Sequence, residues 1–219
     1  MRGVLRVFIL WVLFTTSSFA TTDSELNRHY NSIHAQAKDL SPKVLKLALS
    51  AYFHARKQGL DDKEIITIVD YTLPSNVKRM WVFDLSQNKL LHHTRVSHGS
   101  GSGLLYAKHF SNTPETHKSS VGLFLTKNDY KGIAGYSLRL KGLEPGINDR
   151  AEARSIVMHG AHYADPSFVE SYGRLGRSEG CFALPTANYA DIIHDLVDGT
   201  LIFAYYPEKS WLKHSKYLA

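Results

Sequence analysis

Residues 65–96 read IITIVDYTLPSNVKRMWVFDLSQNKLLHHTRV, and these letters set the class of the fold. The stretch opens with a β-branched run at 65–70 and continues with apolar runs at 79–85 and 90–96. Turn-forming residues, Ser86 to Lys89, separate the second run from the third. Short runs bounded by such residues are typical of strands in a hairpin, so the stretch predicts the first strands of a β-rich domain.

The same pattern continues downstream of this hairpin. We expect further strands at 121–126, 137–140, 155–159 and 201–206, with helices at 167–172 and 186–197. Many short strands with few helices favour a mainly β fold with flanking helices. We assign this domain to residues 65–207 and treat residues 208–219 as a C-terminal tail.

The N-terminal part of the chain carries a secretion signal and then a helical segment. Residues 1–20 combine a basic start at Arg2 and Arg6, a short apolar stretch and a small-residue ending at Ala20. These regions in this order predict a signal peptide, so we expect a secreted, periplasmic protein. Residues 21–64 predict a short helical segment, because Ser41-Pro42 is a helix-start signal and apolar residues then recur at helical spacing.

The charge pattern of the mature chain does not favour a nucleic acid as its partner. Removing Arg2 and Arg6 from the 26 basic residues leaves 24 against 20 acidic residues, a net charge of +4. No basic cluster with interleaved aromatic residues accompanies this excess, so the sequence does not predict nucleic-acid binding. A mild positive charge is compatible with attraction to an anionic polymer such as a cell wall. No apolar run after residue 20 is long enough to span a membrane.

Cys181 is the only cysteine of the chain, so it cannot form an intramolecular disulfide. It ends the run Gly-Arg-Ser-Glu-Gly-Cys and lies 22 residues after His159, which belongs to the run Ile-Val-Met-His-Gly. A neighbouring imidazole can hold a thiol as thiolate and imidazolium and so make the sulfur nucleophilic. The pair predicts a cysteine nucleophile with a histidine base, and a buried cysteine with a buried histidine is the alternative.

Four further residues are candidates for shaping the surroundings of the thiol. Gly160 allows backbone or substrate to approach closely, and Gly180 allows a tight loop whose N–H groups, with that of Cys181, face a developing oxyanion. Ser178 is expected to orient this loop by hydrogen bonding, because the nearby thiol is the stronger nucleophile. His98 begins a Gly/Ser-rich loop and is weighed both as a lining residue of the substrate groove and as a turn residue.

A zinc site is the alternative use of the same region. His159 and His162 are three residues apart, and Cys181 would complete a three-ligand set. No carboxylate or further histidine lies at a familiar metal-binding spacing, so the sequence favours chemistry without a metal or another cofactor. A zinc-dependent hydrolase of wall peptides remains the second hypothesis.

Several short motifs accompany the thiol and the imidazole between residues 68 and 207. They are Ile68-Val69-Asp70-Tyr71, Val82-Phe83-Asp84-Leu85, His98-Gly99, Phe110-Ser111-Asn112, Ser119-Ser120-Val121-Gly122, Leu143-Glu144-Pro145-Gly146-Ile147-Asn148-Asp149, Gly173-Arg174-Leu175-Gly176-Arg177-Ser178 and Ala183-Leu184-Pro185. Together with His159-Gly160-Ala161 and Ser178-x-Gly180-Cys181, they resemble the L,D-transpeptidases, the YkuD-like family. Within it they are most similar to the murein L,D-transpeptidase catalytic domains.

The resemblance implies a β-sandwich-like domain with Cys181 in a groove. It implies that Cys181 attacks the carbonyl after the L-centre of meso-diaminopimelate in a peptidoglycan stem tetrapeptide, that His159 activates the thiol, and that a terminal D-alanine leaves. Attack on the thioester by the side-chain amine of another diaminopimelate gives a 3→3 cross-link. Attack by water makes the same site an L,D-carboxypeptidase. A non-catalytic wall-binding module with an inert Cys181 is the third hypothesis.

The chain departs from the family pattern at two positions beside the thiol. Glu179 stands where the family has histidine before Gly-Cys, and Ala183 stands where members often carry arginine or asparagine. Arg174, Arg177 and Tyr163 are further candidates for contacting the substrate, the two arginines as replacements for a carboxylate-binding cation. The departures bear on substrate anchoring and on the choice of acceptor more than on the nucleophile.

Overall fold

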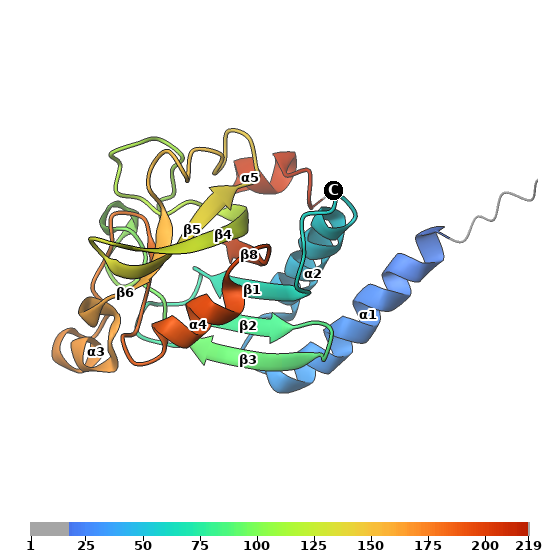
Figure 1. Cartoon of the computed structure of the whole chain (residues 1–219), viewed down its shortest axis with the longest axis horizontal. Coiled ribbons are helices and arrows are strands. Elements are labelled where there is room, and N and C mark those ends of the chain that lie inside the picture. The colour runs from blue at the N-terminus through green and yellow to red at the C-terminus, as the bar shows by residue number, and fades with distance from the viewer. Residues whose placement is uncertain (1–17, 219) are drawn as a thin grey trace, which may run out of the picture.

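The computed structural model describes residues 18–218, which form one eight-stranded sheet flanked by helices (Figure 1). Residues 1–17 of the expected signal peptide lie outside the described residues, and residues 18–20 belong to the first helix. Within residues 18–218, no helix combines the length and apolar character needed to cross a membrane.

The sheet combines parallel and antiparallel strands in the order β3-β2-β1-β8-β4-β5-β6-β7. Strands β1 and β8 pair in parallel, as do β6 and β7, and the other neighbours are antiparallel. In chain order the elements are α1 (Ser18–Gln36), α2 (Pro42–Arg56), β1 (Ile65–Asp70), β2 (Met80–Asp84), β3 (Lys89–Thr94), η1 (Ser100–Ser102), β4 (Gly122–Gly132), β5 (Gly135–Gly142), β6 (Val157–Gly160), η2 (His162–Ala164), α3 (Pro166–Tyr172), β7 (Phe182–Leu184), α4 (Tyr189–Leu196), β8 (Leu201–Tyr205) and α5 (Lys209–His214).

Hydrophobic cores cover both faces of the sheet at its centre. Alternate residues of a strand point to opposite faces, so Ile66 and Ile68 of β1 join one core with α2, while Val69 joins the other core with α4. Every residue of β1 and β8 is consequently buried, as expected for strands covered on both sides. Figure 1 shows α1 and α2 at one end of the molecule and α4 in front of the sheet.

The mainly β fold with flanking helices agrees with the sequence prediction, and most of the predicted strands are present. The structure adds β7 and extends β4 and β5 into a long hairpin that ends in a turn between Gly132 and Gly135. The predicted second helix starts later than expected, at Tyr189. The hydroxyl of Thr186 instead donates to the Asp165 carboxylate at 3.0 Å, so it is engaged with the segment before α3.

The last residues of the chain are not a tail, which corrects the assignment of 208–219. Helix α5 inserts Trp211 into the core, where its side chain is fully buried and its indole N–H donates to the Glu144 carboxylate at 3.0 Å. Tyr217 is buried as well. Residues 208–219 hold too few apolar residues in a regular pattern for the sequence to predict a packed element. The packing of Trp211 also involves Glu144, which is distant in the sequence.

The two edges of the sheet meet next to Cys181. After β3, the N–H of Ser97 donates to the Ala183 carbonyl in β7 at 2.9 Å. The N–H of Ser178 donates to the His98 carbonyl at 3.1 Å, and the N–H of Ser100 donates to the Ser178 carbonyl at 2.7 Å. Because β3 and β7 are the outermost strands, these bonds show that the sheet curls until its edges join.

A buried arginine holds the segment that makes this junction. Arg79 is fully buried directly before β2. Its Nε and Nη2 donate to the Val96 carbonyl at 3.1 and 2.8 Å, and its Nη1 donates to the Leu73 carbonyl at 2.9 Å. Nη2 also donates to Nδ1 of His98 at 2.8 Å, while Nε2 of His98 donates to the Gly103 carbonyl at 3.3 Å. Burial, followed by the charge of Arg79, lowers the pKa of His98 to about 3, so the ring is neutral.

We predict that His98→Ala destabilises the fold by about 1–3 kcal/mol, because it leaves a buried donor of Arg79 without its partner and removes one of the two donors to the Gly103 carbonyl. Urea unfolding of the purified protein measures the change. His109→Ala removes an exposed imidazole from the same region and should change stability by less than about 0.5 kcal/mol. Equal unfolding midpoints for the two variants would contradict the role given to His98.

Candidate active site

The structure brings the predicted nucleophile and the predicted base to neighbouring strands. Cys181 directly precedes β7, and His159 is the third residue of β6. The two strands run parallel, with Ala183 opposite His159 and Phe182 opposite Met158. Cys181 therefore lies two residues before the level of His159, about 7 Å along the strand direction. An imidazole on one strand and a thiol at the start of the next are thus close in space.

The hydrogen bond of His159 determines which ring nitrogen can act as a base. His159 is buried, and its Nδ1 lies 3.0 Å from the Gly160 carbonyl oxygen. A carbonyl oxygen only accepts, so Nδ1 carries the proton and Nε2 keeps its lone pair in the neutral ring. The backbone of the next residue thereby fixes the ring in the tautomer that a general base at Nε2 requires.

The thiol of Cys181 is protonated in the resting structure. Burial has the largest effect and raises its pKa; a hydrogen bond from the Val157 backbone lowers it, the charge of Glu179 raises it and the charge of Arg154 lowers it. The Sγ–H donates to the Ser155 carbonyl at 3.5 Å. The pair of thiolate and imidazolium considered from the sequence would therefore require transfer of the proton from Sγ.

Ser178 shapes the loop before the thiol. Its hydroxyl donates to the Cys181 carbonyl at 2.7 Å and accepts from the Gly180 N–H at 3.2 Å. Gly180 has a φ of 121°, and a Cβ there would lie 2.7 Å from the side chain of Ile156. The loop therefore requires glycine at this position. Its N–H is engaged by Ser178, which corrects the expectation that the Gly180 N–H faces an oxyanion.

Two other candidates lie close to the thiol but differ in what they contact. A Cβ at Gly160 would lie 2.6 Å from the ring of Tyr189, so this glycine admits an aromatic ring of α4 and not a substrate. Tyr163 is half-buried, and burial, the charge of a Cys181 thiolate and that of Glu179 raise the pKa of its hydroxyl to about 12. Tyr163 therefore remains a neutral neighbour of the thiol.

The remaining predicted substrate contacts are engaged with the protein itself. Arg174 donates to the Leu175 carbonyl at 2.9 Å, and Arg177 donates to the carbonyls of Ser100 and Gly103 at 3.0 and 3.2 Å. His98 is fully buried with both ring nitrogens bonded, so it offers no atom to a substrate. His98 therefore does not line a substrate groove, which corrects one of the two roles considered for it. The structure favours the other, in which His98 is a structural residue of the turn.

The alternative zinc set is not assembled. The side chain of His162 is 94% exposed, and its Nδ1 pairs with the Asp165 carboxylate at 3.2 Å. Among residues 18–218, no three histidine, cysteine, aspartate or glutamate side chains are grouped so that they could hold a metal ion. His159, His162 and Cys181 are therefore not arranged as zinc ligands.

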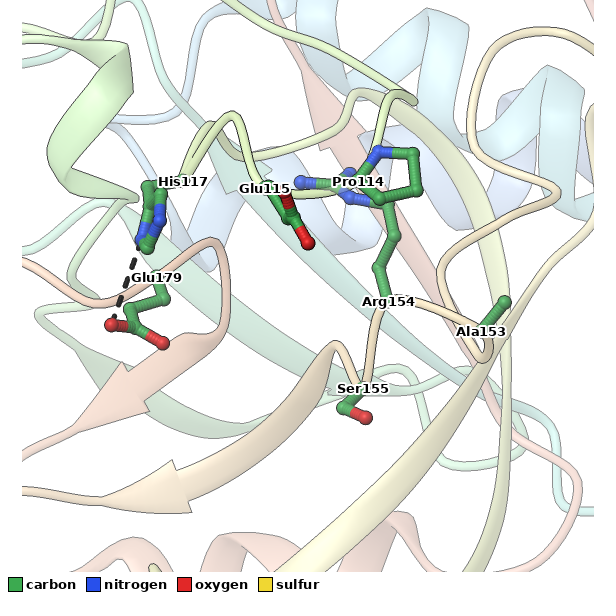
Figure 2. Close-up of a pocket in the computed structure, with 7 residues that line it drawn as sticks. All are labelled: Pro114, Glu115, His117, Ala153, Arg154, Ser155 and Glu179. Atoms are coloured by element: carbon green, nitrogen blue, oxygen red, sulfur yellow. Dashed lines mark ion pairs between the residues drawn. The ribbon is translucent and has the colours of Figure 1, made fainter.

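A cavity of about 310 Å³ is lined by Ser155 and by Glu179, which lies two residues before Cys181 (Figure 2). The backbone carbonyl of its lining residue Ser155 accepts a hydrogen bond from the Cys181 thiol. Figure 2 shows His117 and Glu179 paired on one side of the cavity and Glu115 between them and the backbone of Arg154. The lining residues are Pro114, Glu115, His117, Ala153, Arg154, Ser155 and Glu179. Apart from Glu179, no sequence pattern identifies any of these residues as part of a site.

Arg154 builds one wall of this cavity. Its Nη1 donates to the Ser111 carbonyl and the Ser120 hydroxyl, both at 2.7 Å, and its Nη2 donates to the Lys118 carbonyl at 2.6 Å. These bonds close the loop over residues 111–120, which carries Glu115 and His117 into the cavity. No sequence signal identifies this role, because all three acceptors are neutral oxygens at least 34 residues away in the chain.

The backbone around the cavity is strained. Among residues 18–218, six residues other than glycine have a positive φ, and three of them line the cavity: Glu115 at 61°, His117 at 51° and Ser155 at 55°. Such conformations cost energy and tend to be retained at functional sites. The strain therefore marks this cavity as the region of the surface in which to look for substrate.

We predict that Glu179→Gln shifts the pH dependence of Cys181 alkylation to lower pH. The carboxylate raises the pKa of the thiol, so its removal increases the thiolate fraction at a given pH. Iodoacetamide labelling followed by mass spectrometry measures the profile without background, because Cys181 is the only cysteine. The shift should shrink in high salt, since Glu179 is 83% exposed.

The matched control is Glu170→Gln, which removes an exposed carboxylate of α3 outside the cavity and should leave the profile unchanged. A shift of the Glu179→Gln profile to higher pH would show that the charge of Glu179 does not act on the thiol as described.

Comparison with solved structures gives weak similarity over part of the chain. An L,D-transpeptidase from Mycobacterium smegmatis is 15% identical, with 65% of this chain and 59% of that chain covered and a TM-score of 0.40. An L,D-transpeptidase (Yku) from Stackebrandtia nassauensis is 10% identical, with 83% and 90% covered and a TM-score of 0.39. A fused Zn-dependent amidase/peptidase/peptidoglycan-binding domain-containing protein from Clostridium acetobutylicum is 18% identical, with 75% and 62% covered and a TM-score of 0.38.

The family assignment rests on the sequence and not on these structures, because their TM-scores are low. The chain spans only 59% of the length of the mycobacterial chain. No curated protein matches it in sequence. Residues 36–205, however, match the model of the L,D-transpeptidase catalytic domain, which is well over half of the chain and contains both His159 and Cys181. The chain therefore belongs to the L,D-transpeptidase catalytic domain family.

Proposed function

We propose that this protein is a periplasmic cysteine transpeptidase that joins peptidoglycan stem peptides by 3→3 cross-links. The observation that carries the proposal is the position of Cys181 and His159 on neighbouring strands beside a cavity, in a chain of the L,D-transpeptidase family. The donor is a tetrapeptide whose third residue is meso-diaminopimelate. The acceptor is the side-chain amine of a second diaminopimelate.

In the acylation step, His159 supplies the base that the protonated thiol needs. Nε2 takes the proton of Sγ, and the sulfur attacks the carbonyl carbon that follows the L-centre of diaminopimelate. The imidazolium then returns this proton to the nitrogen of the terminal D-alanine, the C–N bond breaks, and D-alanine leaves. The product is a thioester on Cys181. The bond from Nδ1 to the Gly160 carbonyl supports this role, because it leaves Nε2 as the basic atom.

In the second step, the thioester is attacked by an acceptor, and the sulfur leaves. An amine as acceptor gives the cross-link, while water gives a tripeptide and makes the protein an L,D-carboxypeptidase. Both outcomes use Cys181 and His159 in the same roles. The signal-peptide pattern of residues 1–20 supports export to the periplasm, where peptidoglycan is present.

We predict that Cys181→Ala lowers turnover of tetrapeptide muropeptides by more than about a thousandfold, because the nucleophile is lost. His159→Gln should lower it by about a hundredfold or more, because proton transfer is lost while the thiol stays. Product formation is followed by mass spectrometry, and the wild type should show a covalent adduct on Cys181 whose mass corresponds to the tripeptide acyl group.

His162→Gln is the matched control, because it removes an exposed imidazole three residues from His159. This variant should keep wild-type turnover, and a chelator should not reduce activity. Loss of activity in His162→Gln together with chelator sensitivity would favour the zinc hydrolase. Wild-type turnover in Cys181→Ala would refute the cysteine mechanism.

A further inference from the structure

The cavity of about 310 Å³ is lined by two neighbours of Cys181, namely Ser155 and Glu179. The thiol touches its wall, since Sγ donates to the Ser155 carbonyl at 3.5 Å. The half-buried sulfur has Gly180 behind it, packed against Ile156 and the Lys118 carbonyl. A molecule that extends from the cavity past Ser155 would therefore come close to the sulfur.

The charge available to a ligand in this cavity is negative. Glu115 and Glu179 contribute two carboxylates, and Figure 2 shows the Glu115 side chain directed into the space. Arg154 adds one positive charge, but its guanidinium donates to three neutral oxygens of the loop over residues 111–120, so the two carboxylates outnumber it and it directs these N–H groups away from a ligand. His117 faces Glu179 at 3.6 Å. The acidic cavity contrasts with the chain as a whole, which carries a formal charge of +6.

We propose that this cavity binds the ammonium-bearing end of the acyl acceptor, with Glu179 and Glu115 as its specificity-determining residues. The inference rests on the function proposed above and names the part of the surface that selects the acceptor. It also gives a physical role to Glu179, the residue at which this chain departs from the family's usual Ser/Thr-His-Gly-Cys pattern.

The sign of the charge distinguishes the acceptor from the donor. The departing end of the donor is a D-alanine with a free carboxylate, which two glutamates repel. The acceptor presents a primary amine, which resembles a lysine side chain and is an ammonium ion at neutral pH. A site rich in carboxylates and adjacent to the sulfur is therefore suited to the acceptor.

Transfer of the acyl group from Cys181 to the acceptor amine requires no further reactant. The bound ammonium loses one proton to solvent, and the neutral nitrogen attacks the thioester carbonyl carbon. The C–S bond breaks with its electron pair going to Sγ, and the second proton passes from nitrogen to Nε2 of His159 and then to the thiolate. Water competes with the acceptor amine for the same thioester. Unlike the ammonium group, water does not depend on the carboxylates to reach the site. Removing the carboxylates should therefore favour hydrolysis over cross-linking.

The test uses two peptides that cannot exchange roles. The donor is a stem tetrapeptide whose diaminopimelate side-chain amine is acetylated, so it cannot act as an acceptor. The acceptor is a stem tripeptide that ends in diaminopimelate with a free side-chain amine, so it has no D-alanine to lose. Mass spectrometry of the full-length protein's products gives the ratio of cross-linked dimer to hydrolysed donor as the acceptor concentration rises.

We expect the acceptor concentration that gives equal cross-linking and hydrolysis to rise about threefold in Glu179→Gln or Glu115→Gln and about tenfold in the double variant, as for partly exposed ion pairs. Because the ratio compares two fates of one intermediate, changes in acylation rate do not affect it. Glu170→Gln, the exposed control on α3, should keep the wild-type ratio. High salt should reduce the difference between wild type and the double variant.

An unchanged ratio in the double variant would overturn the inference, and so would an equal loss in Glu170→Gln. A Cys181 adduct that is only hydrolysed at every acceptor concentration would overturn the inference while leaving the cysteine chemistry in place. A wild-type protein that forms no adduct would overturn the proposed function and the inference with it.

Discussion

The hydrogen bonds of the buried Arg79 guanidinium support the geometry of the candidate active site. A buried charge is stable only when its donors are matched, and Arg79 matches them with two backbone carbonyls and His98. Those bonds fix the segment after β3, and the carbonyl of His98 in turn accepts from Ser178 in the loop that leads to Cys181. The position of the nucleophile thus depends on an arginine that never meets substrate.

A second arginine, Arg154, also fixes a loop near the thiol through hydrogen bonds to neutral oxygens. Arg154 donates three hydrogen bonds to neutral oxygens of the loop over residues 111–120, and this loop carries Glu115 of the cavity. Neither guanidinium needs a carboxylate partner to be held in place. The loops around Cys181 are therefore fixed from the protein side, and the carboxylates of Glu115 and Glu179 face a space where a ligand can use them.

The sequence predicted what depends on local patterns and missed what depends on long-range contacts. The runs at 65–70 and 201–206 became the buried central strands because their apolar character is visible in a short window. Strand β7 has only three residues, and the meeting of the sheet edges joins Ser97 to Ala183, so neither leaves a local pattern. Cys181 and His159 were found from their residue types and motifs. Arg154 was not, because its function comes from three distant oxygens, and His98 was weighed as groove-lining because a His-Gly pair does not reveal burial.

The half-buried, protonated thiol of Cys181 is also protected from oxidation between encounters with substrate. Peroxides and other oxidants attack the thiolate far more readily than the thiol, and exposure increases the damage. Because burial raises the pKa of Cys181 and its Sγ–H is turned toward the Ser155 carbonyl, the sulfur is slow to form a sulfenic acid at rest. A chain with a single cysteine has no partner within itself to reverse such oxidation through a disulfide. The same surroundings that keep Cys181 protonated therefore also protect its sulfur from oxidation.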